Sequence, residues 1–294
     1  MCLLVSLILI GSLCMGCSSS EKGFWEAENQ LRILGPYCSN EQHSEGDNVF
    51  NSERKIVGVV SEEDLQELQQ IMNGMKKFFA EEYDVDISTK IDELPTIRTF
   101  TMEAKDGIIL DGYYEPSLNQ LALRKEVLND KVARNAVFVH EMLHYLGFSQ
   151  QNCGIFLEGL TDALSVKCQE YLGLEVYQSN AYDLSRKLGF QILEVDKELV
   201  KKAFTEPDFD IYSRINERLA NVKQPITQID AKDIAPNLDW CVSCIFFSPY
   251  QDTTSLQFQA QEIVACYLKT FEPTEAQIEV IRQNYIVADY EEIK

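Results

Sequence analysis

Two histidines stand four residues apart in the segment His140-Glu-Met-Leu-His144, inside an amphipathic run that predicts a helix. Residues four apart on an α-helix share a face, so both imidazoles can reach one ion. Glu141 lies about 100° around the helix from His140, where it can take a proton from metal-bound water. The chain has three histidines, and two of them fall in this segment. The segment therefore predicts a zinc site on a helix, the alternative being two buried histidines with ordinary core hydrogen bonds.

A hydrolytic zinc ion needs a third protein ligand and an open position for water. No histidine follows His144, so we expect the third ligand to be a carboxylate. Glu158 and Asp162 lie four residues apart on the next predicted helix. Glu158 can bind the metal, while Asp162 can accept the free ring N–H of a ligating histidine and fix its tautomer. The alternative is a solvated acidic pair on a surface helix.

The motifs His140-Glu-Met-Leu-His144 and Glu158-Gly-Leu-Thr-Asp162, on consecutive predicted helices, resemble those of the zincin metallopeptidases. Within that group they resemble the gluzincins, whose third ligand is a glutamate on the following helix. The resemblance implies that His140, His144 and Glu158 bind Zn²⁺ and that Glu141 is the general base and acid. It also implies that Asp162 orients His140 and that the substrate is a peptide or protein.

The resemblance covers roughly residues 90 to 175 and has limits. The thirteen residues between His144 and Glu158 form a shorter gap than in thermolysin, so the likeness extends to the architecture and not to that family. Metzincins fit less well, because Gln150 stands where their third histidine would be.

A gluzincin also needs a hydrogen-bond donor for the tetrahedral oxyanion, commonly a tyrosine or histidine. We assign this role to Tyr182 as a prediction. The other candidates, each of which could be an ordinary core or rim residue, are Tyr177, Tyr113, Tyr114 and His43.

The predicted fold class is α+β and zincin-like, with a small N-terminal β-sheet and active-site helices followed by a mainly helical C-terminal part. Strands are expected at 97–102, 108–114 and 120–124, the last two forming a hairpin. Its edge could bind an extended peptide, although it could equally be an ordinary hairpin. Helices are expected at 62–82, about 130–146, 155–172, 180–193, 196–204, 209–221, 253–271 and 274–284, with Pro225 and Pro236 in an irregular connection.

The N-terminus carries a short apolar run, Leu3 to Ile10, which ends in small residues before Cys17. The run is too short to span a bilayer, so a removed signal segment is expected. Small residues before a cysteine resemble the lipobox of bacterial lipoproteins, although no Lys or Arg precedes Lys22. The resemblance implies that Cys17 is acylated and that the protein is anchored by lipid outside the cell membrane.

We divide the chain into a signal peptide (1–16), a tether and irregular lead-in (17–55), a catalytic core (56–176) and a helical C-terminal subdomain (177–294).

The net charge of −21 argues against nucleic acid as a partner. Besides Cys17, the mature protein is expected to contain six cysteines, and their pairing stays open. Cys241 and Cys244 could form a bridge, stay buried as thiols, or bind metal or act in redox exchange.

The sequence therefore favours a zinc metallopeptidase tethered outside the membrane. Two rivals belong to other classes: a noncatalytic lipoprotein that keeps zinc for stability as a binding or scaffold module, and a lipoprotein that captures metal as a solute.

Overall fold

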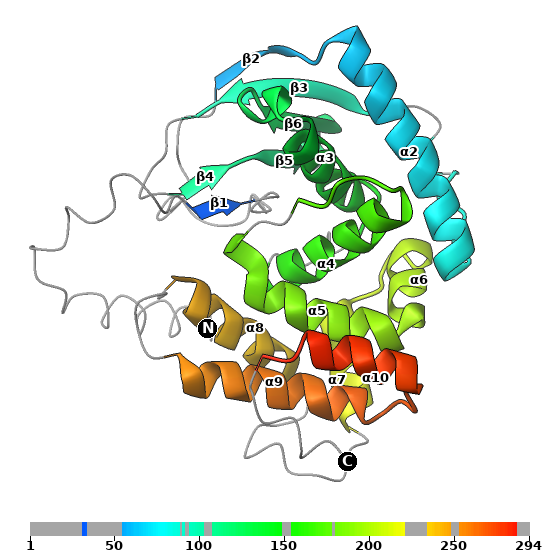
Figure 1. Cartoon of the computed structure of the whole chain (residues 1–294), viewed down its shortest axis with the longest axis vertical. Coiled ribbons are helices and arrows are strands. Elements are labelled where there is room, and N and C mark those ends of the chain that lie inside the picture. The colour runs from blue at the N-terminus through cyan, green and yellow to red at the C-terminus, as the bar shows by residue number, and fades with distance from the viewer. Residues whose placement is uncertain are drawn as a thin grey trace, which may run out of the picture.

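The computed structural model describes residues 31–33, 55–88, 90–91, 94–102, 108–148, 154–177, 180–220, 234–247 and 253–286. The expected signal peptide, the lipidated Cys17 and most of the tether lie outside these residues. The described part is α+β, as predicted, with one mixed four-stranded sheet, a short strand pair and nine α-helices (Figure 1). Within the described ranges, every helix is too short or too polar to serve as a membrane span.

The four-stranded sheet has the order β2-β3-β6-β5, with β2 at Lys55–Val59, β3 at Thr96–Thr101, β6 at Gln120–Arg124 and β5 at Gly112–Glu115. Strand β3 runs antiparallel to β2 and parallel to β6, and β5 runs antiparallel to β6. The 3-10 turn Pro116–Leu118 joins β5 to β6, so the predicted hairpin is present. The single strand expected at 108–114 is, however, divided at Asp111 into two strands that pair in different sheets. Two shorter strands, β1 (Leu31–Ile33) and β4 (Ile108–Leu110), pair in parallel.

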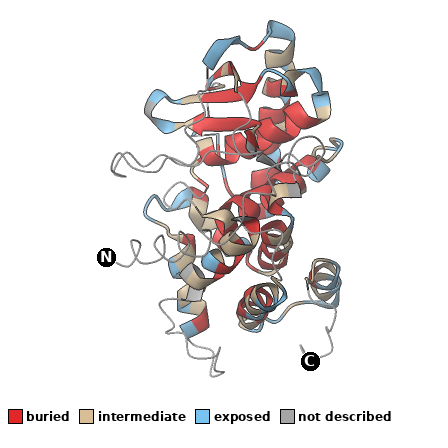
Figure 2. Ribbon diagram, turned by 90° about the vertical axis from the view of Figure 1, so that its left-hand side faces the viewer, coloured by how far each residue is buried: buried red, intermediate tan, exposed pale blue. Residues whose placement is uncertain are grey.

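Alternating side chains of the sheet face opposite ways, as the pleat requires. Leu121 and Leu123 of β6 enter the main core, whereas Ala122 joins Phe100 and Tyr113 in a small second cluster. The main core lies between the sheet and α3, and Figure 2 shows buried residues concentrated there and between the central helices. One face of the sheet therefore supports the helix that carries the two histidines.

Helix α2 (Glu62–Tyr83) begins where Ser61 accepts a hydrogen bond from the backbone N–H of Asp64, which is the predicted N-cap. It packs against α3 (Lys131–Tyr145). The buried guanidinium of Arg134 on α3 forms ion pairs with Asp64 and Glu67 on α2. This contact fixes α3 between α2 and the sheet.

Helices α3 and α4 (Ile155–Tyr171) both occur where the sequence predicted them. Asp130 caps α3 by accepting hydrogen bonds from two backbone N–H groups. After α3 ends, Gly147 has a φ of 104°, and after α4 Gly173 has a φ of 64°. These left-handed conformations favour glycine, so both helices stop at the glycines that the sequence indicated.

The remaining helices are α5 (Asp183–Val195), α6 (Lys197–Thr205), α7 (Ile211–Ala220), α8 (Ile234–Phe247), α9 (Thr254–Leu268) and α10 (Glu275–Gln283). Five were predicted, with a 3-10 turn, η3 (Asn180–Tyr182), at the start of the first. The sixth, α8, was missed because Pro236 was taken as part of an irregular connection. Proline is tolerated in the first turn of a helix, which is where Pro236 lies.

The four cysteines in the described part of the chain, Cys168, Cys241, Cys244 and Cys266, carry free thiols. Cys241 and Cys244 lie on the same side of α8, and burial raises the pKa of the Cys241 thiol to about 12. A thiol with so high a pKa is a poor nucleophile and metal ligand at neutral pH. The buried-thiol interpretation therefore fits Cys241 best, and Cys244 is a half-buried free thiol.

Candidate metal centre

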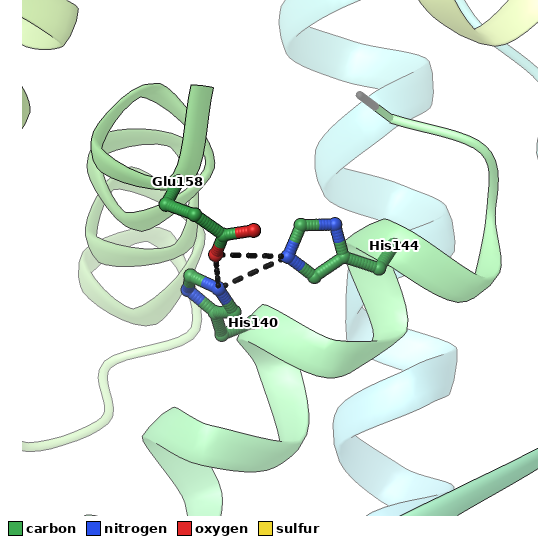
Figure 3. A group of neighbouring side chains, drawn as sticks. All are labelled: His140, His144 and Glu158. Carbon is green, nitrogen blue, oxygen red and sulfur yellow. Dashed lines mark hydrogen bonds and ion pairs between the residues drawn. The ribbon is translucent and has the colours of Figure 1, made fainter. Parts of the chain in front are cut away.

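The side chains of His140, His144 and Glu158 converge between α3 and α4 (Figure 3). The two Nε2 atoms of the histidines are 3.1 Å apart. Glu158 Oε2 lies 3.3 Å from Nε2 of His140 and 3.4 Å from Nε2 of His144. The three residues are buried, and they form the only such group of three metal-ligating residues within the described part of the chain.

These separations match the requirements of one small ion. Zinc ligands at about 2.0–2.1 Å in tetrahedral geometry stand about 3.3 Å from one another. The three atom pairs measure 3.1, 3.3 and 3.4 Å. Two imidazoles and one carboxylate are also the donor set of a hydrolytic zinc site, which leaves a fourth position for water. The residues present therefore fit a zinc ion.

The groups around His140 favour a positive charge on its imidazole ring. Burial alone disfavours the imidazolium, but Asp162 and Glu158 stabilise it, with help from the charge of Glu141, and the pKa of His140 rises to about 10. Burial raises the pKa of Glu158, but His144 and His140 outweigh this effect and lower it. The surrounding carboxylates therefore favour positive charge at the place where a divalent cation would sit.

Asp162 lies one helical turn after Glu158, and both of its carboxylate oxygens face charged or ionisable groups. Its Oδ1 is 3.8 Å from His140 Nδ1, and its Oδ2 is 2.7 Å from Arg186 Nη1. The first separation is longer than a hydrogen bond, so Asp162 acts on His140 through its negative charge. Arg186 comes from α5 and also contacts Asp183 at 3.1 Å. Asp162 therefore lies beside His140, as the sequence predicted, but at a separation longer than the expected hydrogen bond to the ring N–H.

Glu141 is fully buried, and its charge acts on both His140 and Tyr182. Strand β5 passes close to it at Gly112. A Cβ atom on that glycine would overlap with the Val137 side chain and lie 3.2 Å from Glu141 Cγ. A residue without a side chain is therefore needed for the edge strand to approach α3 beside Glu141.

Tyr182 is buried at the end of η3, and its ring stacks on Phe246 with centroids 5.9 Å apart. Burial raises its pKa well above the ordinary value, and the charges of Glu158, Asp162 and Glu141 raise it further. The hydroxyl is therefore protonated at neutral pH and lies in the field of the carboxylates at the site.

The other described candidates for the oxyanion donor make the following contacts. Tyr113 packs against Phe100 in the small cluster on the far face of the sheet, and Tyr114 packs edge-to-face on Tyr145. Tyr177 follows the end of α4 and is half-buried. His43 lies outside the described residues.

A cavity of about 430 Å³ adjoins the C-terminal end of α3. Its walls include Tyr145 and Leu157, the sequence neighbours of His144 and Glu158. The Lys90 ammonium in this cavity donates to the Leu146 carbonyl at 3.0 Å. The three converging side chains are not among the described lining residues of this cavity.

Sequence reasoning missed two features of the site, Arg186 and Gly112. Arg186 is one of many charged residues on a helix, and only the fold brings it to Asp162. The sequence around Gly112 indicates only a turn or strand residue. Its close approach to Glu141 depends on how the sheet packs on α3.

No protein-family model, curated protein or solved structure matches the chain. The functional interpretation therefore depends on the geometry of the residues themselves.

Proposed function

We propose that the protein is a zinc-dependent metallopeptidase with a zincin-like, gluzincin-type centre. The observation that supports this most strongly is the convergence of the three donor atoms at 3.1–3.4 Å, beside the buried Glu141. His140, His144 and Glu158 would hold the ion. Once bound, zinc would lower the pKa of its water to about 7 and polarise the scissile carbonyl.

The chain's own groups supply the proton transfers. Glu141 takes a proton from the attacking water and later delivers it to the leaving amine. The negative charge of Asp162 would favour a proton on His140 Nδ1 and so leave His140 Nε2 free to bind the ion. Arg186 forms an ion pair with Asp162 in its buried position.

Tyr182 donates a hydrogen bond to the tetrahedral oxyanion. Its raised pKa supports this role, because a hydroxyl that stays protonated at neutral pH remains a donor throughout the reaction. The residues that surround it, including Phe246, exclude water from its ring and limit competition from solvent.

The substrate backbone would lie along β5, the outermost strand of the four-stranded sheet in the described part of the chain. An extended peptide can add to such an edge through main-chain hydrogen bonds. Gly112 on β5 faces Glu141, so a peptide on this edge would pass close to the general base. The N-terminal sequence adds the proposal that Cys17 carries lipid and tethers the enzyme outside the cell membrane.

The test combines zinc content with cleavage. Atomic spectroscopy should find one zinc per chain, and casein or a peptide library should be cleaved by the wild type. Glu141→Gln should keep the zinc and lose cleavage, because it removes the base and preserves the shape. Glu170→Gln, the same change on the exposed side of α4, is the matched control and should behave as the wild type.

A noncatalytic zinc lipoprotein is the second candidate, and the burial of all three donor residues favours it. In that case zinc would be bound by the wild type and by the Glu141 variant, with no cleavage by either. Absence of zinc from the wild type would contradict the site itself.

A further inference from the structure

The first turn of α4 carries Glu158 and lacks a side-chain cap of its own. The residue at the N-cap is Gly154, which makes no side-chain hydrogen bond to the helix. A helix leaves its first N–H groups without partners in the helix, and a polar N-cap side chain normally accepts from one of them. The start of α4 must therefore obtain this acceptor from another part of the chain.

Helix α8 supplies the acceptor. Asp239 Oδ1 accepts a hydrogen bond from the backbone N–H of Phe156 at 2.9 Å. Phe156 is the second residue of α4, so the carboxylate occupies the place of an N-cap side chain. Burial raises the pKa of the same carboxylate, whereas the Tyr212 hydroxyl from α7, which lies beside it, lowers this pKa. Three helices thus meet at the start of α4.

Gly154 is the residue that this arrangement requires. A Cβ atom there would overlap with the Asp239 carboxylate and with the Tyr212 hydroxyl. A serine, threonine or aspartate, which could cap the helix from within, cannot occupy the position while Asp239 does. The cap of α4 therefore comes from a residue 83 positions later in the chain, and not from a side chain at the N-cap position.

One backbone hydrogen bond connects the capped start of α4 to Glu158 at the metal centre. The N–H of Glu158 donates to the carbonyl of Gly154 at 3.0 Å. Phe156, between them, is fully buried, and its ring lies 6.4 Å from that of Tyr212. The turn held by Asp239 is therefore the turn from which Glu158 projects toward His140 and His144.

We propose that Asp239 is a positioning residue for the metal centre: by capping the first turn of α4, it sets where Glu158 presents its carboxylate. This inference rests on the proposed function, because it concerns the third zinc ligand. It gives the C-terminal helices α7 and α8 a direct part in metal binding, although none of the three converging donors comes from them.

The test compares three variants of the full-length protein by zinc affinity and by the visible spectrum of bound Co²⁺. Asp239→Ala removes the cap, and we expect a loss of about tenfold in zinc affinity with a changed cobalt spectrum. Asp239→Asn keeps an acceptor oxygen and should restore both toward wild type. Thr274→Ala removes the N-cap of α10 and should lower thermal stability without changing either readout.

Each outcome has a distinct meaning. Wild-type zinc affinity and cobalt spectrum in Asp239→Ala would overturn the positioning role and leave the proposed function intact. No zinc binding by the wild type would overturn both. If Asp239→Ala does not fold, Tyr212→Phe removes the hydroxyl beside the carboxylate and should shift the cobalt spectrum in the same direction to a smaller extent. An unchanged spectrum in that variant would also overturn the proposal.

Discussion

Arg186 Nη1 lies 2.7 Å from Asp162 Oδ2, while the other oxygen of the same carboxylate faces His140 Nδ1 at 3.8 Å. Asp162 and Arg186 are both buried. A buried carboxylate would be costly beside Glu141 and Glu158 unless a cation compensated for its charge. Arg186 provides that cation, and so allows the carboxylates of Asp162, Glu141 and Glu158 to be buried in the same part of the core.

The first prediction concerns this ion pair. Arg186→Met should lower the free energy of unfolding by about 3–5 kcal/mol, because it leaves Asp162 charged and buried without its partner. Urea denaturation measures the change. Lys187→Met is the matched control, since Lys187 pairs with Asp183 at the surface and should contribute less than about 1 kcal/mol. Equal losses in the two variants would contradict the assignment.

The second prediction concerns the orientation of His140. Asp162→Asn should weaken zinc binding by about 10- to 100-fold, because the charge that favours a proton on Nδ1 is lost. Competition with a chromogenic chelator measures the affinity. Asp183→Asn changes the exposed carboxylate that contacts the same arginine, and its affinity should stay within about twofold of wild type.

The third prediction concerns pH. The pKa of His140 is raised from 6.5 to about 10 in the folded protein, so its contribution to stability is fully present below pH 6.5. That contribution is lost as the pH rises toward 10. Protein stripped of metal by a chelator should therefore lose thermal stability over this interval. His140→Asn should lose less over the same interval, and a loss equal to that of wild type would count against the pKa shift.

The fourth prediction concerns Gly112. Gly112→Ala forces β5 away from Val137 and Glu141, and a displacement of the base by about 1 Å can cost about 100-fold in kcat. Zinc affinity should stay unchanged, because no ligand is touched. Gly58→Ala introduces the same methyl group on β2 of the same sheet, 3.3 Å from Thr99 Oγ1, and should retain activity. Equal kcat values in the two variants would refute the role of Gly112.

Local sequence signals were sufficient for most of the helices, but they did not indicate strands β1 and β2. Ser61, Asp130 and the glycines after α3 and α4 mark helix ends by their own backbone chemistry, so the helix limits followed from the sequence. Helix α8 could not be recognised in the same way. Pro236 in its first turn has the same local signature as a proline in a loop.

The same distinction applies to the candidate site. The spacing of His140 and His144 on one helix brings them together without any tertiary information, and Glu158 follows from the need for a third donor. The contacts of Arg186 and Asp239 depend on how α5 and α8 pack against α4. Nothing in the neighbouring sequence of either residue reports those contacts.

The glycine contacts between α4 and α5 bear on how the protein can be divided. A Cβ on Gly159 would overlap with Ser185, and a Cβ on Gly189 would come within 3.0 Å of Leu160 Cα. The two helices therefore pack backbone to backbone across the boundary that the sequence suggested between residues 176 and 177. A fragment cut there would keep every proposed zinc ligand and lose the helices against which Glu158 is held. The smallest independently functional piece should therefore extend at least through α8.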